Sequence, residues 1–136
     1  MAALAKDRGT KERSGDLREP GVKAATTIYT GAMVALDASG RAVPMSTALN
    51  LKGIGCAVEH VDNSGGADNA RRVRVRTGIF QYANSAAGDE ITAADIGADC
   101  YGVDDQTVAK TSGTNTRSVA GKIFDVDAQG VWVRFS

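Results

Sequence analysis

After residue 21 the chain consists of short runs in which apolar and polar residues alternate, separated by clusters of Gly, Asp, Asn and Ser. In "RRVRVRTGIF", Val73 and Val75 alternate with arginines, which is the two-residue period of a strand with one buried face. We expect roughly seven to nine short strands, with turn signals about every eight to twelve residues. The predicted fold class is therefore all-β: a small sandwich or a partly open β-barrel.

Several segments predict individual elements. Strands are expected, among other places, at residues 54–61 and 71–82. Asp and Gly between apolar runs predict hairpin turns at residues 37–40, 104–105 and 127–130. Residues 92–95 predict one helical turn, capped by Thr92 and stopped by Gly97, and no longer helix is expected.

The first 20 residues differ in composition from the rest. The stretch "KDRGTKERSGDLREPG" carries five basic and four acidic residues, with almost no apolar periodicity. Such a segment buries too little apolar surface to fold alone. Residues 1–20 are therefore expected to be either a disordered tail or an extended arm that orders against a neighbouring subunit, and residues 21–136 to form one β-domain.

Charge and composition narrow the classes of partner. Sixteen basic residues balance sixteen acidic ones, so the whole molecule has no field that would gather nucleic acid or an anionic membrane. No run of about 18 apolar residues occurs, and the N-terminus lacks the apolar core of a signal peptide. We expect assembly in a cytoplasm, where Cys56 and Cys100 would be free thiols, although one long-range disulfide is possible.

The segment Asp125-Val126-Asp127-Ala128-Gln129-Gly130 has the look of a calcium loop. An EF-hand loop ends in a bidentate Glu at its twelfth position and is flanked by helices. Here the twelfth residue from Asp125 is Ser136, and the flanks alternate like strands. The segment is instead interpreted as a β-hairpin turn closed by Asp127 and Gly130.

Nucleotide binding and catalysis lack the required residues. The nearest approach to a phosphate loop runs from Gly113 to Gly121-Lys122, with too wide a gap and with Ile123 where a hydroxyl is needed. His60 is the one histidine, and four extended residues put it about 13 Å from Cys56. We predict no enzyme activity, no cofactor and no metal site.

Two clusters of charge remain. The acidic residues 95, 99, 104 and 105 are interpreted as cap and turn residues rather than a paired-carboxylate site. The arginines at 71, 72, 74 and 76 are either a solvated strand face or a basic stripe that docks on an acidic protein surface. Nucleic acid is a less favoured partner, because no aromatic residues interleave with the arginines. The candidate interface residues are therefore the basic groups of the arm and of this stripe: Lys6, Arg8, Lys11, Arg13, Arg18, Arg72, Arg74 and Arg76.

Four segments, in this order, resemble the sequences of one protein family: "YTGAMVALDASGRAVP", "VEHVDNSGGADNARRVRVRTGIFQYANSAAGDEIT", "DIGADCYGVDDQTVAKT" and "AGKIFDVDAQGVWVRF". They look like small head decoration, or capsid cement, proteins of Mu-like and related tailed phages. The resemblance spans about residues 22–136. It implies no catalytic residues and a place on the outer surface of the virion.

The resemblance also implies partners. A decoration protein binds the major capsid protein where subunits meet and associates with itself, with a homotrimer as the first expectation and a dimer as the second. No specific nucleic acid and no membrane partner is expected. The alternatives are a head-completion or tail-tube protein and, less favoured, a DNA-processing or host-directed phage protein.

Overall fold

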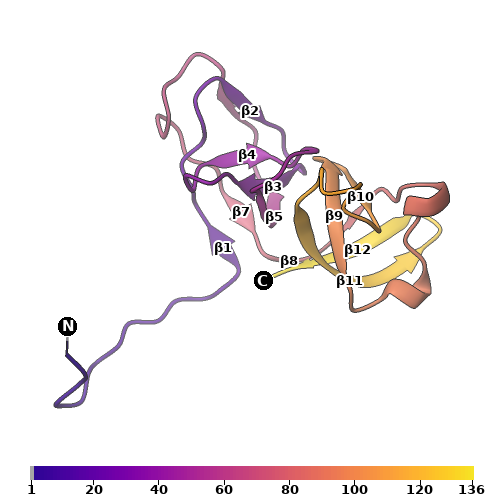
Figure 1. Ribbon diagram of the computed structural model, residues 1–136. Coiled ribbons are helices and arrows are strands. Elements are labelled where there is room, and N and C mark those ends of the chain that lie inside the picture. Colours follow the sequence, from indigo (N-terminus) through magenta and orange to yellow (C-terminus); the bar gives the residue numbers. More distant parts are fainter. Residues whose placement is uncertain (1) are drawn as a thin grey trace.

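A computed structural model describes residues 2–136 (Figure 1). Within these residues the regular structure consists of twelve strands and two single 3-10 turns, which confirms the all-β class. The strands outnumber the expected seven to nine because long alternating segments are divided. The segment 71–82 breaks before Gly78, whose φ of +134° is unfavourable for residues with a side chain, and continues in a different sheet.

Two five-stranded antiparallel sheets and a two-stranded ribbon contain all the strands. The first sheet has the order β1 (Leu17–Arg18), β7 (Val75–Arg76), β5 (Lys52–Ala57), β3 (Met33–Leu36) and β4 (Ala42–Pro44). The second has the order β10 (Thr107–Ala109), β9 (Asp99–Asp104), β11 (Val119–Asp127), β12 (Gly130–Phe135) and β8 (Gly78–Tyr82). The ribbon pairs β2 (Thr26–Ile28) with β6 (Val61–Asn63).

The second sheet curls toward closure. Its first and last strands meet where Ala83, directly after β8, forms a parallel bridge with Thr107 of β10. The backbone N–H of Ala83 donates to Gln106 O at 2.8 Å, and that of Val108 donates to Ala83 O at 3.0 Å. This half of the molecule is thus a small, partly open barrel, of which Figure 1 shows β9 to β12 in orange and yellow.

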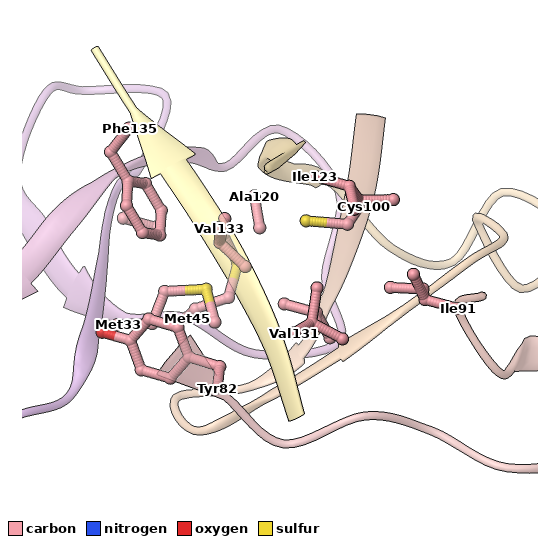
Figure 2. Packing of buried hydrophobic residues seen from close by; sticks show 12 residues of the cluster. Met33, Met45, Tyr82, Ile91, Cys100, Ala120, Ile123, Val131, Val133 and Phe135 are labelled. Carbon is pink, nitrogen blue, oxygen red and sulfur yellow. The ribbon is translucent and has the colours of Figure 1, made fainter. Parts of the chain in front are cut away.

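Strand β3 lies between two hydrophobic cores because its successive side chains point to opposite faces. Met33 and Ala35 belong to the core shared with the curled sheet, whereas Val34 belongs to the core beneath the β2–β6 ribbon. Figure 2 shows Val133 of β12 in the first core, with Met33 on one side of it and Ile123 on the other. The first sheet therefore acts as a shared middle layer.

The two five-stranded sheets approach closely where β5 crosses β11. A Cβ atom on Gly53 would collide with the backbone carbonyl of Ala120. Because backbone cannot move aside as a flexible side chain does, this crossing requires glycine. The sequence gives no sign of this requirement, since it depends on strands about 67 residues apart.

The predicted turns are present. Gly40 has φ +80° and its N–H donates to Asp37 O at 2.9 Å, closing the β3–β4 hairpin. Asp127 faces Gly130 across the β11–β12 hairpin. The helical turn is the 3-10 segment η2 (Ala93–Asp95), capped reciprocally by Thr92 and Asp95. A second such turn, η1 (Ala87–Asp89), was not predicted.

Candidate interaction surface

The N-terminal segment divides into a free arm and an anchored root. Residues 2–14, called the arm below, contain no strand or helix and are exposed throughout. Figure 1 shows them leading away from the rest of the molecule. Residues 15–20, called the root, belong to the first sheet, because β1 pairs with β7 in the register Leu17–Arg76 and Arg18–Val75.

Hydrogen bonds fix the root on both sides of β1. The N–H of Thr77 donates to Asp16 O at 3.0 Å, and its hydroxyl donates to Gly15 O at 2.7 Å. At the other end, the N–H of Val73 donates to Pro20 O at 3.1 Å. The free part of the N-terminal segment is therefore shorter than the first 20 residues.

The arginine stripe binds the root. Arg72 Nη1 donates to the carbonyl of Glu19 at 2.8 Å, and Arg74 Nε lies 3.3 Å from a Glu19 carboxylate oxygen. Val73 and Val75, which alternate with these arginines, are fully buried, as the alternation predicted. Two of the three candidate arginines thus have partners within the chain, so the stripe is only partly available to an outside surface.

The structure groups the candidate interface residues in two places. Arg18 lies on β1, directly beside the strand that carries Arg76. The four candidates that precede β1 are spread along the exposed arm and, among residues 2–136, make no ion pair: Lys6, Arg8, Lys11 and Arg13. The arm is therefore the place where unpaired positive charge is most accessible.

The segment that resembles a calcium loop is a hairpin turn. One carboxylate oxygen of Asp127 accepts the N–H groups of Gln129 and Gly130, at 2.8 and 3.2 Å. The other accepts Trp132 Nε1–H at 2.9 Å. The Trp132 bond, followed by the backbone bonds, lowers the pKa of Asp127. The first oxygen also accepts Gln81 Nε2 of β8 at 3.2 Å, so both oxygens are used by hydrogen bonds within the fold.

Of the acidic residues at 95–105, Asp95 and Asp104 serve as the cap and turn residues that the sequence predicted, whereas Asp99 lies on β9 and forms an ion pair. Asp95 accepts the N–H of Thr92 at 2.8 Å, Asp99 lies 2.6 Å from the ammonium of Lys122, and Asp104 accepts the N–H of Gln106 at 2.9 Å. Within residues 2–136, no three His, Cys, Asp or Glu side chains are placed to hold a metal ion.

The one histidine and the two cysteines have separate roles in the fold. The ring of His60 packs edge-on against Tyr29, with 5.2 Å between centroids. Both cysteines are free thiols: Cys56 is partly buried, whereas Cys100 lies in the core, where burial raises its pKa to about 11. A thiol with so high a pKa carries little thiolate near neutral pH, so Cys100 is a poor nucleophile.

A groove beside β4 was missed by sequence reasoning. It has a volume of about 560 Å³, and its lining includes the apolar residues Val43, Pro44 and Met45 and the acidic residues Asp104 and Asp105. Burial, followed by the charge of Asp104, raises the pKa of Asp105. Its walls come from segments about 60 residues apart, so no local pattern marks it.

Several large apolar side chains are exposed elsewhere on residues 2–136. Phe124 on β11 is 47% exposed and lies beneath the guanidinium of Arg134, 5.1 Å from its ring centroid. Tyr29 is 62% exposed, and Leu4 of the arm, at 73%, is the most exposed of all. Alternation alone did not single out these residues.

No helix in the described part of the chain is long and apolar enough to cross a membrane. Comparisons of the chain with protein-family models, with curated proteins and with solved structures gave no match.

Proposed function

We propose that this chain is a phage capsid decoration protein, which binds the mature shell at junctions between major capsid subunits and stabilises it against the pressure of packaged DNA. The observation that carries the proposal is the arm: about thirteen exposed residues that project from a root anchored by β7, Arg72 and Arg74. An arm held firmly at one end positions its free part for a neighbour. The family resemblance of residues 22–136 supports the same function.

The compact β-body and the arm have separate tasks in this proposal. The body covers a junction, and the arm extends the contact across the seam. A protein that binds the mature lattice and not the immature one shifts the equilibrium toward the mature state. Each copy that bridges several subunits adds to the effect through its high effective concentration, so many modest contacts give large stabilisation.

The arm deletion tests the proposal. Removing residues 2–14 leaves the root and its partners Thr77, Arg72 and Arg74 in place, whereas removing all twenty residues would also delete β1. We expect the deleted protein to fold with an unchanged unfolding midpoint but to be retained on purified heads at several-fold lower occupancy, and the heads to lose heat tolerance.

A matched control keeps the length of the arm and removes its chemistry. In this variant residues 2–14 are replaced by Gly and Ser, which gives a flexible segment of equal length. The proposal expects this variant to behave like the deletion. Full occupancy and unchanged heat tolerance with both variants would refute the role given to the arm.

A further inference from the structure

We propose that the arm of one copy binds in the groove beside β4 of a second copy of this chain. The inference deepens the proposed function, on which it rests for the presence of neighbouring copies. The occupant is residues 2–14 of a neighbour, and the receiving surface is this groove. Chemical complementarity, reach and the direction in which the arm leaves the molecule all favour this pairing.

The groove combines an apolar floor with negative charge. The floor is formed by Val43, Pro44, Met45, Ala48 and Leu51. Three carboxylates line it, against the single ammonium of Lys23: Asp37, Asp104 and Asp105.

The three carboxylates differ in the hydrogen bonds that they already accept within the chain. Asp37 accepts the N–H groups of Ser39 and Arg41, and Asp104 accepts the N–H of Gln106. Asp105 is partly buried, and neither it nor Asp104 forms an ion pair within residues 2–136. Unpaired carboxylates at the edge of an apolar groove suit a ligand with an apolar anchor and flanking cations.

The arm has this composition. Its stretch "AALAKDR" places Leu4 among alanines and follows it with Lys6 and Arg8. Leu4 is 73% exposed, so its apolar surface has no cover in the chain's own fold. Residues 2–14 carry four cationic side chains and two carboxylates, so the net charge of the arm is positive, whereas that of the groove is negative. Leu4 would occupy the floor while the two cations approach Asp104 and Asp105.

Reach and direction favour a second copy. Thirteen extended residues span at most about 45 Å, which is more than three times the radius of gyration of about 13 Å expected for a 100-residue domain. The arm leaves from the start of β1, whereas β4, beside the groove, is bonded to Gly21 and Lys23 just beyond the other end of the root. Figure 1 shows the arm pointing away from its own body.

The contact uses two different surfaces, the arm of one copy and the groove of the next. Such a heterologous contact repeats from copy to copy and closes into a ring when the rotation between neighbours allows it. A trimer held in this way would have three arms in three grooves. The inference thus gives the expected self-association a specific geometry.

The test is a crosslink that can form only between chains. One full-length chain carries Ala3→Cys, which leaves Leu4 intact, and a second carries Ser46→Cys at the rim of the groove. Both carry Cys56→Ser, while Cys100 stays buried. After mixing and mild oxidation, we expect the Ala3–Ser46 product at least tenfold above a control pair, in which the second chain carries Gln129→Cys on the exposed β11–β12 turn.

Two changes probe the chemistry of the contact. Leu4→Asp in the first chain, or Asp104→Asn with Asp105→Asn in the second, should each lower the product several-fold, and high salt should act in the same direction. A chain that carries both Ala3→Cys and Ser46→Cys shows whether the groove receives the arm of its own chain or that of a second copy. If it forms only the intrachain bond, or if the Ala3–Ser46 product does not exceed the control, docking on a second copy is wrong.

The failure of this inference and that of the proposed function have different signatures. The crosslink reports arm and groove in the purified protein, without particles. Absence of the protein from purified particles would reject the capsid role and leave the crosslink result intact. A decoration protein that gives no crosslink would keep its function and lose this mode of self-association.

Discussion

At the scale of single residues, polar side chains of this protein mostly complete turns. Asp37, Asp62 and Asp127 each accept a backbone N–H two residues further along the chain. Such bonds replace the ladder partners that the backbone loses where a strand reverses. They were predictable from Asp and Gly between apolar runs, because the bonds are local in the sequence.

Asp127 should matter more to stability than its neighbour Asp125. Asp127→Ala removes the acceptor for two backbone N–H groups and for Trp132 Nε1. The Asp125 carboxylate accepts only the next N–H, that of Val126. We expect Asp127→Ala to lower the thermal unfolding midpoint by several degrees and Asp125→Ala to leave it nearly unchanged. Equal effects of the two substitutions would contradict the role assigned to the turn.

Acid should destabilise the fold. Hydrogen bonds to the charged form lower the pKa of six aspartates below the ordinary value of about 3.8: Asp16, Asp37, Asp62, Asp89, Asp95 and Asp127. Their stabilisation is present above that value and is lost as the pH falls through the lowered folded values. Burial raises the pKa of Asp105, so its contribution to stability changes with pH in the opposite direction. It is one group against six.

The measurement is the unfolding midpoint followed from about pH 6 to about pH 2.5. We expect it to fall below about pH 4, and Asp127→Asn to make the decline shallower by removing one of the titrating groups. A midpoint that stays level or rises as acid is added would show that the lowered pKa values do not govern stability.

At the scale of elements, the sequence predicts those strands whose alternation is unbroken. β12 buries Val131, Val133 and Phe135 on one face, as the period of two requires. β11 could not be assigned as fully, because its pairing shifts register between Ile123 and Asp125 and the alternation is interrupted there. The break at Gly78 could likewise not be predicted, since one glycine inside an apolar run does not indicate that the chain passes into another sheet.

The crossing of β5 over β11 should tolerate no added atom. We expect Gly53→Ala to cost about 1–3 kcal/mol of unfolding free energy, because the new Cβ meets the Ala120 carbonyl. Gly65→Ala is the matched control, since nothing lies near its added Cβ, and should stay within about 0.5 kcal/mol of the parent. Chemical denaturation measures both, and a neutral Gly53→Ala would contradict the close approach of the sheets.

The root should be held by the arginine stripe. Trypsin is expected to cut the parent protein after Lys6, Arg8, Lys11 and Arg13 before it cuts after Arg18 of β1. Arg72→Ala with Arg74→Ala removes the bonds to Glu19 and should speed cleavage after Arg18 up to about fivefold, as befits weak surface interactions.

The control for this experiment is Arg134→Ala, which changes an arginine on the curled sheet. It should leave cleavage after Arg18 unchanged. Early cleavage after Arg18 in the parent protein would show that the root is as free as the arm.

At the scale of the whole molecule, most of what bears on function depends on segments that are distant in the sequence. The all-β class, the distinct N-terminal segment and most turns were predictable from local patterns. The division into a middle sheet with a core on each face was not, nor was the groove, because β4 and the β9–β10 turn meet only after the sheets have packed. The arginine stripe was found, but not its binding to Glu19.

The central claim is that this protein is a building block of a phage particle, and its copy number tests that claim most directly. The measurement is quantitative mass spectrometry of phage particles purified from cells that carry the gene for this chain, with the major capsid protein as reference. The decoration role predicts hundreds of copies per particle, in fixed ratio to capsid subunits. About a dozen copies would indicate a connector ring instead, and a trace amount or none would contradict the claim.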